Sequence, residues 1–218
     1  MNRPAFILLV LLILPSSLFA QKVKFGIYAD PQFSWFNPES RTVKNDGSLF
    51  KFQGGLILEK YFQDNYAINT GIGIGSQGGK LNFEEASTIH VYNELDSLPP
   101  GTTVEYHLNY LTVPLGLKLK TNQIGYFSYY ALVGFTNQFN IKAYANSDDE
   151  TLNKDVISKE IRLYNLAYHF GIGVEYYISE NTAFTVGVVY HNGFLDITKS
   201  DNASVHSRII AIRLGVIF

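Results

Sequence analysis

A strict alternation of apolar with small or polar residues runs along two adjoining segments, 110–120 and 125–136, and it constrains the fold more than any other feature. In 110–120 (YLTVPLGLKLK) every second residue is Leu or Val, and in 125–136 (GYFSYYALVGFT) a comparable set of apolar residues recurs at the same spacing. A period of two puts each set on its own face of a β-strand. The continuous apolar face would line the core of a soluble sandwich or face lipid in a membrane barrel.

The same period recurs along most of the chain and predicts eight strands. The alternation is clearest in 66–77 and 161–178, where large apolar residues face away from a row of small and polar ones. The predicted strands are 22–36, 49–61, 66–77, 104–120, 125–143, 161–178, 182–191 and 205–218.

The predicted connections alternate between short and long. Residues 63–65, 121–123 and 179–181 are short and rich in turn-forming residues, whereas 37–48, 78–103, 144–160 and 192–204 are long. Bacterial outer-membrane barrels have short periplasmic turns and long extracellular loops. We therefore expect an all-β fold, an eight-stranded antiparallel up-and-down transmembrane β-barrel with both termini in the periplasm. A soluble secreted barrel of the lipocalin type would need the opposite polarity, with the apolar face inward.

The first 20 residues are typical of a secretory signal peptide. Arg3 precedes an apolar run over 6–14, and Pro15 and small residues lead to Ala20. The run is shorter than the roughly 20 residues that a membrane-spanning helix needs. We expect residues 1–20 to be a cleaved signal peptide and 21–218 to be the barrel domain; a retained anchor is the alternative.

The amino-acid composition excludes further classes of protein. Without Arg3, the 17 basic residues become 16 against 19 acidic ones, a net charge of −3 that gives no sign of nucleic-acid binding. The chain has no cysteine, which excludes disulfides and a lipid-modified cysteine. No long apolar helix follows the N-terminal segment, so a membrane span would have to be a closed barrel.

Aromatic residues cluster where membrane interfaces are expected. One girdle is predicted near the short turns and a second near the long loops. The first comprises Tyr61, Phe62, Tyr66, Tyr126, Phe127, Tyr129, Tyr176, Tyr177, Phe184 and Phe218, and the second comprises Phe33, Trp35, Phe36, Phe50, Phe135, Phe139, Tyr164 and Tyr190. The chain ends on an apolar strand with Phe218, which is similar to the terminus by which barrel-insertion machinery recognises its substrates.

Eight strands enclose a lumen just wide enough for side chains to fill. The predicted inward set is Lys24, Tyr28, Asp30, Lys51, Gln53, Glu59, Lys118, His169, Glu175 and Arg213. Unpaired charges in such a space are costly, so we expect pairing. Our hypothesis is that Glu59, Lys118, Glu175 and Arg213 form a luminal charge network that plugs the periplasmic half; a proton path or narrow conduit is the alternative.

The segment 108–118 (LNYLTVPLGLK) resembles the hallmark strand of the PorT-like outer-membrane β-barrel family of Bacteroidetes-type bacteria. Residues 130–134 (YALVG) and 170–175 (FGIGVE) resemble the strands that follow it. Thr112 stands where the family often has Glu. The resemblance covers essentially all of the chain after the signal segment. It implies a small envelope barrel, whose founding members are needed for type IX secretion and gliding motility.

No metal-ligand spacing, phosphate loop or nucleophile motif is present, and we expect no catalytic residue, metal or cofactor. A rim-active hydrolase is the weaker enzymatic hypothesis. It would use residues expected near the extracellular rim, namely His107, His191, His206, Asp196, Asp201 and Ser204. The loop 78–103 is long and acidic, with Glu84, Glu85, Glu94 and Asp96, and could be a solvated loop or a binding surface.

Two functions therefore remain open besides the hydrolase. In the first, the barrel is a non-enzymatic envelope protein that supports a secretion or surface complex, as the resemblance implies. In the second, it binds a ligand or a surface partner through its long loops. The expected partners are outer-membrane lipid, the barrel-insertion machinery and envelope or secretion-complex proteins.

Overall fold

The computed structural model describes residues 22–91, 94–148, 152–199 and 203–218, and these ranges contain eleven strands. The signal peptide predicted over residues 1–20 and the rim candidate Asp201 lie outside the described residues. The strands are β1 (Val23–Glu39), β2 (Val43–Gln63), β3 (Tyr66–Phe83), β4 (Ser87–Val91), β5 (Glu94–Leu98), β6 (Thr102–Lys120), β7 (Phe127–Ser147), β8 (Asn153–Val156), β9 (Tyr164–Tyr177), β10 (Ala183–Gly193) and β11 (Ser204–Ile217).

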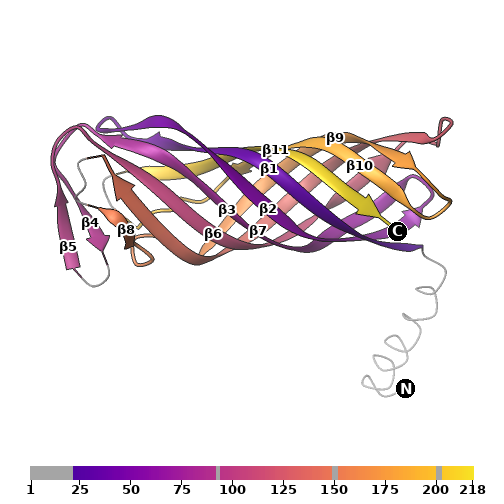
Figure 1. The fold of residues 1–218 in the computed structure, drawn as a ribbon, viewed down its shortest axis with the longest axis horizontal. Coiled ribbons are helices and arrows are strands. Elements are labelled where there is room, and N and C mark those ends of the chain that lie inside the picture. The colour runs from indigo at the N-terminus through magenta and orange to yellow at the C-terminus, as the bar shows by residue number, and fades with distance from the viewer. Residues whose placement is uncertain (1–21, 92–93, 149–151, 200–202) are drawn as a thin grey trace, which may run out of the picture.

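Eight long antiparallel strands close into a barrel (Figure 1). Each strand of the ring β1-β2-β3-β6-β7-β9-β10-β11 pairs with its neighbour in the sequence order, and β11 pairs back onto β1. At that junction the backbones of Phe25 and Phe218 exchange two hydrogen bonds, of 2.9 and 2.8 Å. The predicted eight-stranded up-and-down barrel is confirmed. No helix in the described part of the chain has the length and hydropathy to cross a bilayer.

The two ends of the barrel differ. At the end called here the short-turn end, residues 64–65, 121–126 and 178–182 connect the strands, and β1 begins and β11 ends there (Figure 1). At the opposite end, called the loop end, the connections are 40–42, 84–101, 148–163 and 194–203.

Two of the loops expected at the loop end have structure of their own. The segment 78–103 is not simply a loop, because β3 and β6 extend into it and β4 pairs with β5 as a hairpin between them. The short strand β8 adds to the edge of β7. The prediction of a long connection over 37–48 is wrong. The strands β1 and β2 extend well beyond their predicted ends and leave a turn of only residues 40–42.

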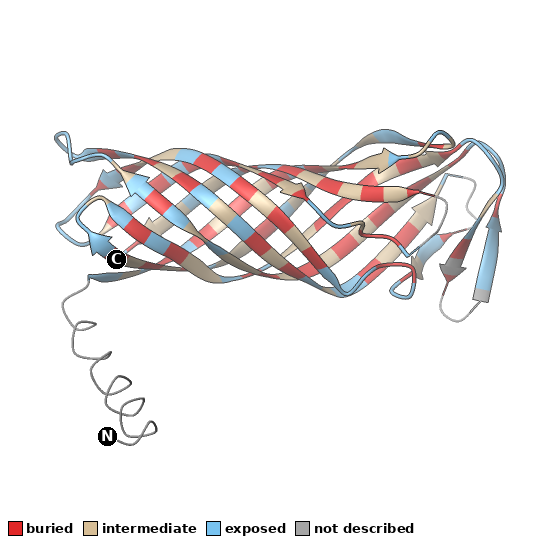
Figure 2. Cartoon of the chain, turned by 180° about the vertical axis from the view of Figure 1, so that it is seen from behind, coloured by how far each residue is buried: buried red, intermediate tan, exposed pale blue. Residues whose placement is uncertain are grey.

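Burial alternates along most of each strand of the ring, as the sequence period predicts (Figure 2). On β6 the side chains of Tyr110 and Thr112 are buried, whereas Leu115 on the other face is 57% exposed. On β11 Ile212 is 48% exposed beside the buried Ala211. Over the middle and the short-turn half of the barrel, the large apolar residues thus face outward and the polar and small ones inward, which is the reverse of a soluble barrel.

Three aromatic residues assigned to the interface girdles point inward instead. Phe36 is buried among apolar side chains, and Tyr61 and Tyr177 are buried in the lumen. The reason is the period itself, because only one of two consecutive strand residues can face outward. Phe62 and Tyr176 take the outward positions next to Tyr61 and Tyr177, and both are exposed.

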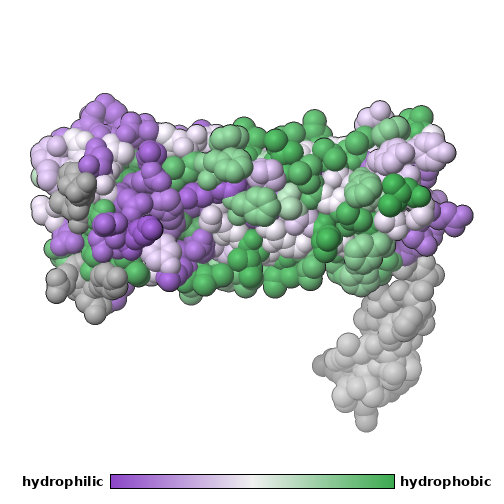
Figure 3. Space-filling view, in the orientation of Figure 1, coloured by the Kyte–Doolittle hydropathy of each residue, from purple (hydrophilic) through white to green (hydrophobic). Residues whose placement is uncertain are grey.

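The outward apolar positions form a belt that covers only part of the barrel's length. On β6 the outward residues from Leu111 to Leu119 are all apolar or small, whereas Glu105, His107 and Asn109, on the same face nearer the loop end, are polar. A strand needs about 9–11 residues to cross a bilayer, and this run of nine meets that requirement. Figure 3 shows apolar surface over the middle and the short-turn half, and hydrophilic surface gathered at the loop end.

Candidate functional site

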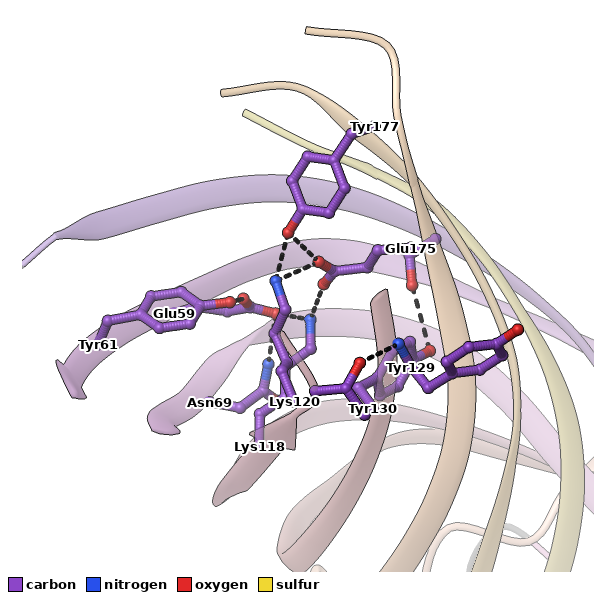
Figure 4. Close-up of polar contacts among 11 residues, drawn as sticks. Glu59, Tyr61, Asn69, Lys118, Lys120, Tyr129, Tyr130, Glu175 and Tyr177 are labelled. Atoms are coloured by element: carbon purple, nitrogen blue, oxygen red, sulfur yellow. Dashed lines mark hydrogen bonds and ion pairs between the residues drawn. The ribbon is translucent and has the colours of Figure 1, made fainter. Parts of the chain in front are cut away.

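The lumen at the short-turn end contains a cluster of buried charges from three strands. Glu59 comes from β2, Lys118 and Lys120 from β6, and Glu175 from β9 (Figure 4). The alternation of β2, β6 and β9 turns all four side chains inward. Both carboxylates are about 1% exposed, so each depends on the lysines for its stabilisation.

Lys118 lies between the two carboxylates. Its Nζ donates to Glu59 Oε1 at 2.5 Å and also to Glu175 Oε1. Lys120 Nζ donates to Glu175 Oε2 at 2.5 Å. Two lysines and two carboxylates therefore neutralise one another.

Two tyrosines complete the cluster on the side of the short-turn end. The hydroxyl of Tyr61 donates to Glu59 Oε2 at 2.7 Å, and that of Tyr177 donates to Glu175 Oε2 at 2.8 Å. The aromatic ring of Tyr130 lies beneath Lys118, with Nζ 4.6 Å from the ring centroid. The carboxylates are thus well supplied with donors, which is the condition for burying them without a large penalty.

Arg213 does not form an ion pair with this cluster. Its Nη2 donates to Asp30 Oδ2 at 2.8 Å, and its guanidinium lies over the ring of Tyr28, 4.6 Å from the centroid. The structure therefore brings Glu59, Lys118 and Glu175 together and gives Arg213 a separate partner. A cavity lined by both Arg213 and Lys118 measures only about 10 Å³, at the lower limit for one water molecule.

An open vestibule leads from the short-turn end to the cluster. It has a volume of about 450 Å³, and its lining includes Lys22, Lys24, Tyr61, Lys120 and Tyr177. Its inner wall is thus made of side chains that bind Glu59 and Glu175. The charge cluster forms the floor of the vestibule.

Two histidines lie further along the lumen toward the loop end. The rings of His169 and His191 are 5.7 Å apart, and Nδ1 of His169 is 2.9 Å from the Thr136 hydroxyl. His169 fits because its neighbour Gly116 has no side chain; a Cβ there would lie 3.0 Å from His169 Nε2. His169 was expected inward, but His191 was expected at the rim and lies in the lumen instead.

The loop end is closed by an apolar core. Side chains of the barrel wall, among them Phe36, Leu81 and Tyr106, pack against residues of three separate connections. These residues are Ile89, Val91 and Leu98 from the β4–β5 hairpin, Leu152, Ile157 and Ile161 from the connection between β7 and β9, and Ile197 and Ala203 from the connection between β10 and β11. We call this set the loop cap. A cavity beside it measures about 20 Å³, room for roughly one water molecule.

Those residues of the hydrolase hypothesis that the structure describes do not assemble into a triad. His206 Nε2 lies 3.4 Å from the Ser204 hydroxyl and 3.6 Å from Glu39 Oε1, so both contacts involve one ring nitrogen. A catalytic triad needs the serine and the acid on different nitrogens. Asp196 accepts hydrogen bonds from the backbone N–H groups of Thr198 and Val205, which gives it a role in loop structure.

Among the residues predicted to face the lumen, Lys51 differs most from the prediction. Along β2 the exposed Phe50 and Phe52 alternate with Lys51, which pairs with the buried Gln32 of β1. The pairing of β2 with β3, however, shifts in register between Ser48 and Gln53, and Lys51 Nζ lies 2.5 Å from His107 Nδ1. His107 alternates with the buried Tyr106 and Leu108 and so lies on the outer face of β6. Where a bulge interrupts the pairing of two strands, the period of one strand does not by itself predict which group a long side chain reaches.

Sequence reasoning also omitted Lys120, Tyr61 and Tyr177 from the charge network. Lys120 could have been found, since it lies two residues after Lys118 and so shares its face. The pairing of Asp30 with Arg213 depends on the contact between the first and the last strand, which the sequence period does not by itself reveal.

A closed eight-stranded barrel with an apolar outer belt and a charged, filled lumen defines the class of outer-membrane β-barrel proteins. Residues 19–199 match the family described as "Outer membrane protein beta-barrel domain". The chain belongs to this family. The family match confirms the expected location in the bacterial outer membrane.

Several solved structures have a similar course of the chain. Neisserial surface protein A is 12% identical, with 88% of this chain and 95% of that chain covered and a TM-score of 0.46. OprG from Pseudomonas aeruginosa is 14% identical (91% and 97% covered, TM-score 0.48), and a major outer membrane protein from Thermus thermophilus is 12% identical (90% and 99% covered, TM-score 0.48). No curated protein matches the chain in sequence.

Proposed function

We propose that this protein is a non-enzymatic interaction protein of the outer membrane, which presents its loop cap to a partner in the cell envelope or at the cell surface. The observation that carries the proposal is the shared apolar core of three connections at the loop end. Leu98, Ile157 and Ile197, one from each connection, are no more than 1% exposed. Connections packed in this way form a preformed surface, which lowers the entropy that binding must overcome.

The filled lumen favours an interaction protein over a channel. The charge cluster of Glu59, Lys118 and Glu175 lies across the short-turn half, and the loop cap covers the other end. An ion or solute would have to break several buried ion pairs and an apolar core on its way. We therefore expect no conductance from the purified protein in planar bilayers.

The proposal includes an orientation. We place the short-turn end, with both termini of the barrel, in the periplasm and the loop cap outside, after removal of residues 1–20 as a signal peptide. The short connections 64–65 and 178–182 support this, because periplasmic turns of such barrels are short.

The finer role rests on the resemblance of 108–118 to PorT-like barrels. It supports an accessory role in a secretion complex. The second candidate, a surface partner bound by the loop cap without a role in secretion, rests on the same packed connections. The rim hydrolase has less support, because Ser204 and Glu39 contact a single nitrogen of His206.

A photo-crosslinking amino acid at Leu95 tests the proposal. Leu95 is 62% exposed on the β4–β5 hairpin, and Gln123 in an exposed short turn is the matched control at the other end. In intact cells we expect a defined envelope or surface protein to be linked at position 95 and not at 123. Secretion components among the products would favour the accessory role. Folded protein without any specific product at position 95 would count against the proposal.

A further inference from the structure

The outer wall of the barrel has a groove at the loop end, distinct from the lumen and the loop cap. Its volume is about 420 Å³, within the range of about 300–1,000 Å³ usual for small-ligand sites. Lys51 of β2, His107 and Asn109 of β6, Asn146 of β7 and Lys154 of β8 line it. Five polar side chains from four strands thus converge on one depression.

The groove lies directly beside the membrane belt. Asn109 and Leu111 are successive outward residues of β6, and the apolar belt on that strand begins at Leu111. On β7, the exposed Phe139 and Ile141 mark the same boundary. Figure 3 shows hydrophilic surface meeting apolar surface in the corresponding part of the barrel wall. A group bound here would lie at the depth of lipid headgroups.

A hydrogen-bonded chain holds the cationic side of the groove in place. Lys51 Nζ is 2.5 Å from His107 Nδ1, and His107 Nε2 is 3.0 Å from Glu105 Oε1. Burial and the neighbouring Lys51 lower the pKa of His107, so that its ring is neutral at pH 7 and accepts from the ammonium group. Lys51 and His107 come from the two strands that flank β3, and on β3 Ser76 and Gly78 pair with Asn109 and His107.

Glu105 offsets only part of this positive charge, because it also pairs with Lys80. Lys80 Nζ lies 2.9 Å from Glu105 Oε2. Lys142 lies nearby, with Nζ 4.7 Å from the centroid of the Tyr144 ring that also lines the groove. Lys51, Lys142 and Lys154 lie around the groove, and Lys80 pairs with Glu105. These four lysines outnumber Glu105 and leave an excess of positive charge.

Lys154 is fixed on the opposite side by an uncommon backbone conformation. Its φ is +56°, the only positive value of a non-glycine residue in the described ranges. The side-chain oxygen of Asn146 accepts a hydrogen bond of 2.7 Å from the Lys154 backbone N–H. Such a conformation costs about 1 kcal/mol or more and often marks a functional site.

We propose that this groove binds the phosphate-bearing headgroup of an outer-leaflet glycolipid, with Lys51 and Lys154 on the phosphate and Asn109 and Asn146 on sugar hydroxyls. The inference rests on the proposed orientation, because only with the loop end outward does the groove face the outer leaflet. Basic pockets at membrane interfaces bind anionic headgroups in this way. The amides supply the donors and acceptors that a sugar requires and a fatty-acid chain does not.

Lipid binding by the purified barrel provides the test. The wild type, the double variant Lys51→Gln/Lys154→Gln and the control Lys159→Gln/Lys199→Gln are placed in phosphatidylcholine nanodiscs. Lys159 and Lys199 are exposed at the loop end and do not line the groove. Each protein is titrated with lipopolysaccharide, with its dephosphorylated form and with phosphatidylglycerol, and bound lipid is counted by native mass spectrometry.

We expect the groove variant to bind lipopolysaccharide at least about tenfold more weakly than the wild type, since charge-assisted hydrogen bonds are lost. The control variant should bind like the wild type, and dephosphorylation should abolish the difference. Circular dichroism verifies that all variants are folded. Equal binding of lipopolysaccharide by the wild type and the folded groove variant would overturn the proposal. So would a wild type that binds phosphatidylglycerol as tightly as lipopolysaccharide.

The orientation is tested separately, so that the two proposals can fail independently. Because the chain has no cysteine, Leu95→Cys provides a single thiol for labelling in intact cells with a reagent that does not cross the membrane. Labelling at position 95 supports the orientation. Headgroup binding in nanodiscs together with unlabelled Leu95→Cys in folded protein would contradict the orientation and the outer-leaflet assignment but not the binding of the headgroup.

Discussion

Lys118 Nζ lies 2.5 Å from Glu59 Oε1, and both side chains are almost completely buried in the lumen. The same ammonium group contacts Glu175, which Lys120 also binds. The site is thus organised around one lysine that two carboxylates share. Its removal leaves buried negative charge without its main partner.

We predict that Lys118→Met destabilises the barrel by about 3–5 kcal/mol, the usual cost of breaking a buried ion pair from one side. The free energy of unfolding is measured by urea denaturation in detergent micelles or lipid vesicles. The exposed Lys159→Met should change it by no more than about 0.5 kcal/mol. A similar small effect at Lys118 would show that the cluster does not stabilise the fold.

A second prediction concerns the partner of Arg213. A double-mutant cycle with Asp30→Asn and Arg213→Gln should give a coupling of about 0.5–3 kcal/mol, because the two groups are in contact. The corresponding cycle with Glu59→Gln and Arg213→Gln should give a smaller value. Equal or larger coupling to Glu59 would instead place Arg213 in the Glu59–Lys118–Glu175 network that the sequence suggests.

The loop cap should loosen when one of its central side chains is truncated. Leu98 is completely buried, and Leu98→Ala should cost about 2–5 kcal/mol, as for other large-to-small substitutions in a core. Hydrogen exchange is expected to accelerate in β4, β5 and β8 while the belt strands stay protected. The exposed Leu95→Ala on the same hairpin is the control, and equal exchange in both variants would contradict a packed cap.

The position of the lipid belt gives a fourth prediction. Ile212 is 48% exposed and lies midway along the outward apolar row of β11, so Ile212→Lys should destabilise the inserted barrel by about 2–4 kcal/mol. Asn109→Lys, on the outer face above the belt, should change the stability little. Unfolding titrations in lipid vesicles compare the two. An equal cost at both positions would mean that the belt is wrongly placed.

The sequence determines the eight strands of the ring and, over most of their length, their inward and outward faces. Those features follow from a period of two that runs through β3, β6 and β11, so local alternation suffices to predict them. It also identifies Glu59, Lys118 and Glu175 as inward residues of one end, because each lies close to a short turn.

Only the tertiary structure decides which inward groups touch. Arg213 bonds to Asp30 because closure of the barrel brings β11 beside β1, a contact between residues far apart in the chain. Lys51 of β2 reaches His107 of β6 at the place where the register between β2 and β3 shifts. The loop cap joins three connections that show no regular period, and its packing depends on contacts between side chains brought together only when the ring closes.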